Sequence, residues 1–329
     1  MMLRRLLGSL GVGGPSVDTV LDPGPVLPGA ILTGRVVLDG GKTDVDIDHI
    51  ALELIARVEA EHDGGETEGV VAFDRCTVGG GFRLRAGERQ SLPFGLTVPW
   101  ETPITELYGQ PLGIVLGVRT ELAVSGAKDK GDLDQLTVRP LPAQEAVLEA
   151  LGQLGFAFGS ADLEFGRISG TGQRLPFYQE IELTPAPRYA HAMRELEVTF
   201  LANPGGMEIV LEADKPAGFF SGGHDAVNRH VVSHDGVPHR DWTEAVDAWL
   251  RQLVAGRGVV GVPAPYGHDH GDPYPHHEHE HGHGGHRSGP GMGTVVAAGA
   301  AGVAVGVAGG LVAAEVVDEI GDAMEEDDG

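Results

Sequence analysis

Cysteine is almost absent from this sequence, in which Cys76 is the single one among 329 residues. A lone thiol cannot close an intramolecular disulfide, and a zinc site built on several cysteines is excluded. The cysteine content therefore favours a reducing compartment, and we expect the protein in the cytoplasm.

Basic residues are also scarce, since 23 Lys and Arg stand against 48 Asp and Glu, for a net charge of −25. Binding of nucleic acid needs a basic face, so nucleic acid is excluded as a partner. Part of the imbalance lies at the C-terminus, where the residues from Glu315 onward include eight acids and no Lys or Arg. We interpret residues 321–329 as a solvated acidic tail.

The usual sequence motifs of catalysis are missing. The stretch GVGGPS lacks the G-x-G-x-x-G spacing of a phosphate loop, no G-x-S-x-G elbow is present, and no H-E-x-x-H falls on a predicted helix. The sequence therefore predicts that the protein is not an enzyme and requires no cofactor.

The N-terminal stretch MMLRRLLGSLGVGG has some features of a signal peptide. Its apolar part after Arg5 is short, Gly8 and Gly11 interrupt it, and no small-x-small cleavage pattern follows. We therefore expect residues 1–16 to form a short helical segment packed on the first domain, with secretion as the alternative.

Alternation of apolar and polar residues with period two runs from residue 17 to about 125. In DIDHIALELIARVEAEH, apolar residues recur from Ile50 to Val58, with Glu53 and Arg57 between them. This pattern puts the apolar set on one face of a strand. Gly/Pro-rich turns separate several such segments, so residues 17–127 are predicted to form an antiparallel β-sandwich.

A second β-rich unit is predicted over residues 128–255, after the polar break SGAKDKGDLD at 125–134. It begins with a helix near 143–154, continues with strands that include a hairpin turning at NPGG, and ends with a helix near 242–254. Asp241 and Glu244 have the spacing of a helix-capping pair. Trp242, Val246 and Trp249 share one face of this last helix, and we expect that face to pack into the core.

The stretches SVDTVLDPGPVLPGAILTGRVVLDGG, FGLTVPWETPIT and KDKGDLDQLTVRPLPAQEAVLEALGQLGFAFGSADLEFG resemble the sporulation-control protein family of Bacillus, the Spo0M family. The resemblance covers roughly residues 1–255. It implies two arrestin-like β-sandwiches, a regulatory or scaffolding role and no catalysis. It assigns no functional residues to this chain.

A run of histidines, HDHGDPYPHHEHEHGHGGH, occupies residues 268–286 within a Gly/Pro-rich stretch, 256–293, that is predicted to be a disordered linker. Imidazoles at this density bind zinc or nickel weakly, without a fixed geometry. The candidate metal ligands are His268, His270, His276, His277, His279, His281, His283 and His286.

Other histidines are scattered through the second unit. His191, His224, His230, His234 and His239 are interpreted as surface loop residues, with a metal site as the alternative.

The segment 294–320 is predicted to be a small-residue helix, because residues 295–314 are only Val, Leu, Ala and Gly. A stripe of small residues with period four suits close packing against another helix. Twenty such residues are also long enough to cross a bilayer, although no aromatic belt or basic cluster marks the ends. Self-association and membrane association through residues 294–314 both stay open. The stripe consists of Ala298, Gly302, Gly306, Gly310 and Ala314.

The sequence thus predicts a mainly β, non-enzymatic regulatory or scaffolding protein that acts by binding protein partners. Two alternatives rest on its C-terminal part. The first is a metal-binding or metal-buffering protein that uses residues 268–286, and the second is a membrane-tethered adaptor that uses residues 294–314.

Overall fold

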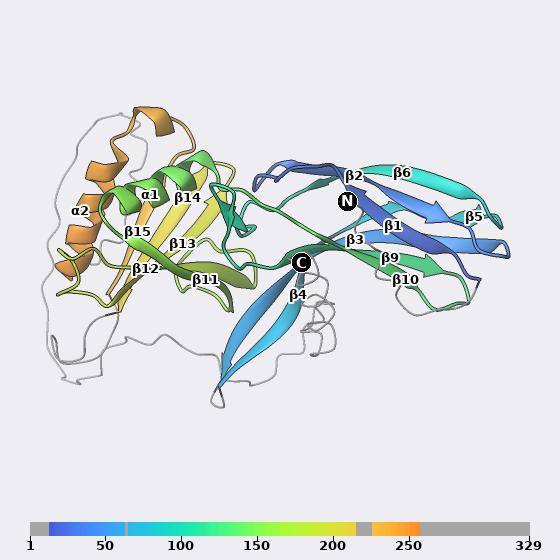
Figure 1. The fold of residues 1–329 in the computed structure, drawn as a ribbon, viewed down its shortest axis with the longest axis horizontal. Coiled ribbons are helices and arrows are strands. Elements are labelled where there is room, and N and C mark those ends of the chain that lie inside the picture. The colour runs from blue at the N-terminus through green and yellow to red at the C-terminus, as the bar shows by residue number, and fades with distance from the viewer. Residues whose placement is uncertain (1–12, 63–64, 215–225, 257–329) are drawn as a thin grey trace, which may run out of the picture.

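A computed structural model describes residues 13–62, 65–214 and 226–256, which fold into two β-rich halves joined end to end (Figure 1). The mainly β fold class predicted from the sequence is confirmed. The predicted N-terminal helix up to residue 12, the linker, the small-residue helix and the acidic tail lie outside the described residues.

The first half is a sandwich of two antiparallel layers. One layer has the strand order β1(Ser16–Leu21), β2(Ile31–Asp39), β6(Arg89–Thr97). The other has the order β10(Lys130–Gln135), β9(Leu116–Val124), β3(Val45–His62), and both β4(Gly65–Gly79) and β5(Phe82–Leu84) pair with β3. The two-stranded hairpin β7(Glu106–Leu107), β8(Gln110–Pro111) projects from the connection between β6 and β9.

Strand β3 forms because its apolar residues alternate, as predicted. Leu52 and Leu54 are fully buried in the sandwich core, whereas Glu53 between them points to the outer face. The opposite layer contributes Val36 and Leu38 of β2 to the same core. The alternation therefore fixes which face of each strand is buried.

The first half extends further along the chain than the boundary predicted at residue 127. Strand β10 pairs with β9 from Lys130↔Leu122 to Gln135↔Gly117. The polar stretch at 125–134 is thus partly an edge strand of the first half, and the crossing to the second half follows it.

The second half contains one sheet in the order β11(Ala157–Phe165), β12(Phe177–Thr184), β13(Glu195–Asn203), β14(Gly206–Asp214), β15(Ala226–Val232). The predicted NPGG turn joins β13 to β14, and a Cβ on Gly206 would lie 2.3 Å from the Val232 carbonyl oxygen, which explains a glycine there. Strand β11 also pairs with the far end of β3 at Glu164↔Glu59, so the two halves share a continuous sheet.

Two helices pack on the apolar face of the second-half sheet, so a helical layer stands where a second sheet would lie in a sandwich (Figure 1). They are α1(Pro142–Gln153) and α2(Trp242–Val254), and they agree with the predicted helices. The Asp241 carboxylate caps α2 by accepting a 2.9 Å hydrogen bond from the Glu244 backbone N–H. Trp249 and Leu250 are buried beneath α2, as the apolar stripe predicts. None of the described helices has the length and apolar character needed to span a bilayer.

A buried amide locks the two halves together. The Gln179 side chain of β12 accepts a 3.0 Å hydrogen bond from the Ile104 backbone N–H and donates a 2.9 Å hydrogen bond to the Ile104 carbonyl. A buried amide that both donates and accepts a hydrogen bond in this way fixes the relative position of the two elements that it joins. Ile104 lies two residues before β7, so the bond holds the start of the hairpin β7–β8 against β12.

Candidate functional site

The candidate metal ligands of the histidine run and the small-residue stripe of the C-terminal segment lie outside the described residues. Both stay predictions. The ligands in question are His268, His270, His276, His277, His279, His281, His283 and His286, and the stripe is Ala298, Gly302, Gly306, Gly310 and Ala314.

Two of the scattered histidines take part in aromatic packing. His230 on β15 stacks on Trp249 of α2 with ring centroids 4.4 Å apart, and burial together with the nearby Arg240 cation lowers the pKa of His230 to about 4. His234 stacks on Trp100 at 5.1 Å. His230 is therefore a half-buried strand residue, not a surface loop histidine. Within the described ranges, no histidine belongs to a group of three or more metal-binding side chains.

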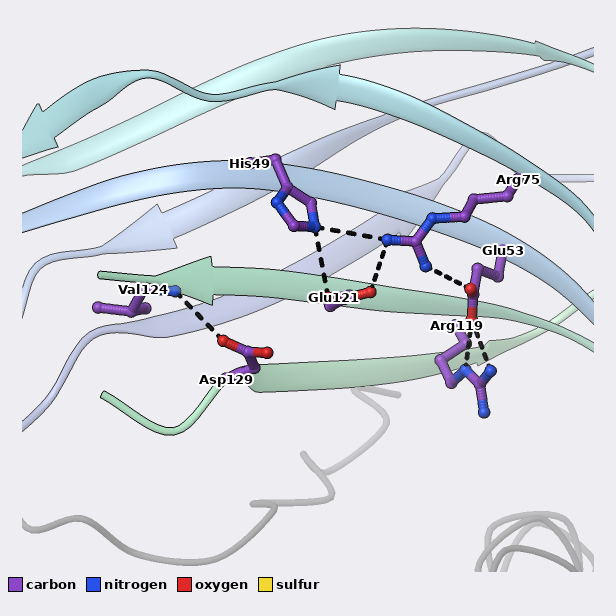
Figure 2. Close-up of polar contacts among 7 residues, drawn as sticks. All are labelled: His49, Glu53, Arg75, Arg119, Glu121, Val124 and Asp129. Atoms are coloured by element: carbon purple, nitrogen blue, oxygen red, sulfur yellow. Dashed lines mark hydrogen bonds and ion pairs between the residues drawn. The ribbon is translucent and has the colours of Figure 1, made fainter. Parts of the chain in front are cut away.

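An ion-pair network covers the outer face of the first-half sheet (Figure 2). Glu53 on β3 lies directly opposite Arg119 of β9 and Arg75 of β4, and both guanidinium groups bond to its carboxylate, Arg119 Nη2 at 2.5 Å. Arg75 also bonds to Glu121 at 2.7 Å, and His49 Nε2 lies 3.3 Å from the same carboxyl group.

Charges within this network balance, because two arginines meet two glutamates. Burial alone would raise the pKa of Glu53, but the hydrogen bonds from Arg119 and Arg75 outweigh it and hold that pKa below its usual value. The network fixes the register of three strands. Its ion pairs join β4, β3 and β9 across the sheet.

A second polar cluster is acidic and lies on the second-half sheet, on the face away from the helices. Its members come from four neighbouring strands, and all are half-buried. We call this set the acidic face; it consists of Asp162, Glu164, Glu180, Glu182, Glu195, Glu197, Glu212 and Asp214.

Cross-strand register brings these carboxylates together. Glu182 lies opposite Glu197, which in turn lies opposite Glu212. Burial, followed by the Glu197 and Asp162 carboxylates, raises the pKa of Glu180 to about 9. Glu180 is therefore protonated at neutral pH, and the face still holds several negative charges.

Carboxylate oxygens of Asp162, Glu164 and Glu180 all lie within 4.8 Å of one another. Oxygen donors at this spacing suit a hard cation such as Ca²⁺. Carboxylates come this close wherever paired strands both carry acidic residues. The cluster therefore shows that the surface is strongly negative, and it assigns no ion to that surface.

A third polar cluster, the pair Asp132 and Asp134, lies on the edge strand β10 of the first half. The Thr19 backbone N–H on β1 donates a 2.6 Å hydrogen bond to Asp132 Oδ2 on β10. Burial, with the Asp132 and Asp18 carboxylates, raises the pKa of Asp134 to about 8. The pair joins β1 to β10 across the two layers.

The fourth feature is an apolar pocket of about 310 Å³ between the halves. The hairpin β7–β8, helix α1 and strand β12 each contribute a wall. Representative lining residues are Leu107, Leu112, Leu148, Leu151, Ile181 and Leu183. The network, the acidic face and the pocket were all missed in the sequence, because each joins side chains from segments far apart in the chain.

Comparison with known proteins supports a family relationship. A family model described as SpoOM protein matches residues 3–217. The sporulation-control protein spo0M of Bacillus subtilis (strain 168) is 37% identical over 215 residues, which cover 65% of this chain and 81% of that protein. A crystal structure of Spo0M, sporulation control protein, from Bacillus subtilis superposes with a TM-score of 0.65 at 31% identity, covering 74% of this chain and 100% of that one. The family match includes all of the acidic face and the pocket, and it ends before the histidine run.

Proposed function

The chain belongs to the Spo0M family of sporulation-control proteins, and from this membership we propose that it regulates by binding other proteins and not by catalysis. Homology to a sporulation-control protein supports the regulatory role. The acidic face is the observation that supports protein binding, and it favours a partner with a basic surface.

The physical argument starts from like charges. Carboxylates placed directly opposite each other on paired strands destabilise a sheet. Glu182, Glu197 and Glu212 form such a row across three strands, and Glu180 and Asp162 form a second pair beside it. A basic partner surface would relieve this repulsion and would be attracted to a chain of net charge −25.

Metal buffering and membrane tethering are separate alternatives. They rest on residues 268–286 and 294–314, and neither uses the acidic face. The two folded halves can therefore be tested for regulation independently of the C-terminal segments.

Complementation tests the proposal. A Bacillus subtilis strain that lacks its spo0M protein would express this chain, and heat-resistant spores would be counted. We expect the wild-type chain to bring the number of heat-resistant spores closer to that of the parent strain, which has its own spo0M protein. The double variant Glu182→Gln with Glu195→Gln should lose this effect, because it removes two charges from the acidic face.

The matched control is Asp22→Asn with Asp235→Asn, which removes two charges at exposed positions elsewhere. It should complement as well as wild type. Equal complementation by both double variants, or no effect of wild-type chain, would contradict the proposal.

A further inference from the structure

The apolar pocket between the two halves has the features of a site for a protein segment. Its wall contains Glu149 as the one charged residue, and the other lining residues are apolar, aromatic or glycine. The pocket has a volume of about 310 Å³. That volume suits one or two apolar side chains and is at the low end for a drug-sized ligand.

Two aromatic side chains stand exposed at the rim. Tyr108 is 60% exposed at the tip of the β7–β8 hairpin, and Phe158 is 48% exposed near the start of β11. Tyr108 and Gly109 both have positive φ, 53° and 75°, as in the tight turn of a two-residue hairpin. This turn holds the tyrosine ring out from the first half, beside the pocket. Exposed aromatic residues around an apolar hollow are typical of protein-binding surfaces.

The charges at the rim are of one sign. Glu149 lines the pocket, and Glu145 lies one turn earlier on the same face of α1. Burial first, and then these two carboxylates, raise the pKa of Tyr108, which places both near its hydroxyl group. The rim is therefore complementary to a basic side chain.

Strand β11 offers an edge beside the pocket. It pairs with β12 from Ala157↔Thr184 to Phe165↔Phe177, with a register shift between Phe158 and Ser160, whereas its pairing with β3 is confined to Glu164↔Glu59. Among the described residues, no strand pairs with the other edge of Ala157–Ser160, and these four residues are exposed. An open edge of this kind accepts an extended peptide by main-chain hydrogen bonds.

We propose that this pocket binds an extended segment of a partner protein, with a leucine-sized or aromatic side chain in the hollow and a lysine or arginine beside Glu149 and Glu145. The inference rests on the proposed protein-binding function and adds the chemistry of the bound segment.

A labelled peptide probes the site. The probe is a fluorescein-labelled heptapeptide with a central leucine flanked by valines and then by arginine and lysine, and fluorescence polarisation measures its binding to the full chain. Replacing the central leucine of the peptide by alanine should weaken binding about tenfold or more, because apolar burial is lost. Replacing its two basic residues by glutamate should abolish binding at low salt.

Gly152→Phe is the decisive variant. Gly152 lines the pocket, and a Cβ there meets no atom within 4 Å, so a larger side chain at this position narrows the pocket without a clash at its own Cβ. Replacing glycine within a helix also favours folding. We expect this variant to keep its melting temperature and to bind the probe at least tenfold more weakly. Glu149→Gln should weaken binding about two- to fivefold and reduce its dependence on salt.

The matched control is Gln252→Phe, which puts the same ring on an exposed position of α2 and should bind the probe like wild type. Binding that is equal in Gly152→Phe and wild type would overturn the inference, as would no binding to wild type at about 1 mM protein. If wild-type chain complements in Bacillus subtilis and the probe does not bind, the pocket inference fails while the proposed function stands.

Discussion

Glu182 on β12 lies directly opposite Glu197 on β13, and both side chains point to the same face of the second-half sheet. A pair of facing carboxylates is unfavourable for folding. Glu180 shows how the sheet accommodates the crowding, since burial and its acidic neighbours keep it protonated at neutral pH. The acidic face therefore has a cost in stability that can be measured.

Glu180→Gln should stabilise the protein at alkaline pH. The pKa of Glu180 is raised to about 9 from 4.5, so the folded state binds the proton more tightly than the unfolded state. The resulting stability is fully present below pH 4.5 and is lost as the pH rises through about 9. Glutamine imitates the protonated form at every pH. We expect the free energy of unfolding at pH 9 to rise by about 1–2 kcal/mol, after allowance for solvent screening.

Urea unfolding at pH 6 and pH 9 would measure this effect, with Asp22→Asn as the control. The gain should be larger at pH 9 than at pH 6 in Glu180→Gln and absent in the control. A loss of stability at pH 9 would mean that the Glu180 carboxylate makes favourable contacts that outweigh the repulsion.

Glu53→Gln should destabilise the first half by about 1 kcal/mol, because it leaves the partly exposed Arg75 and Arg119 without their shared carboxylate. The pKa of Glu53 is lowered, so its contribution is present above the unfolded value of 4.5 and is lost as the pH falls through the folded value. Urea unfolding at pH 7 and pH 3 would show a difference between variant and wild type that shrinks in acid. A pH-independent difference would contradict the electrostatic explanation.

Gly306→Leu tests the small-residue stripe, which lies outside the described residues. Leucine favours a helix far more than glycine does, yet it would block close helix approach at the centre of the stripe. We expect self-association, measured by light scattering, or membrane association, measured by fractionation, to decrease. Ala304→Leu adds the same side chain about 200° away around the helix and should leave association unchanged. An unaltered association state in Gly306→Leu would argue against the stripe.

The histidine run at 268–286 should bind several nickel or zinc ions weakly and leave the folded halves unaffected. Metal requires neutral imidazole, so the affinity should fall as the pH drops through about 6.5. Zinc titration of the full chain and of a truncation to residues 1–255 would locate the binding, and a chelator should not change the melting temperature of either. A tight stoichiometric site in the truncation would instead place metal chemistry in the folded halves.

Local patterns in the sequence predicted β3 and both helices, but not the polar edge strand β10. Alternation from Ile50 to Val58 gave the buried face of β3, and the Asp241–Glu244 spacing gave the start of α2. Each of these signals comes from residues only a few positions apart, which is the range over which side-chain periodicity is informative.

The ion-pair network and the acidic face depend on register between distant segments. Glu53 and Arg119 are 66 positions apart, and their pairing follows from the alignment of β3 with β9, which no local pattern encodes. Glu180 and Glu182 lie two positions apart on one strand, but Glu197 and Glu212 join them only through the pairing of β12, β13 and β14.

Photo-crosslinking in the cells that make this protein tests most directly whether it acts by binding a basic partner through the acidic face. A photo-reactive benzoylphenylalanine would replace Glu182 in one strain and the exposed Asp22 in another, and crosslinked proteins would be identified by mass spectrometry. We predict a discrete partner with a basic surface at position 182, absent at position 22 and lost when Glu195→Gln and Glu197→Gln are added. The same products at both positions, or none at position 182, would contradict the account.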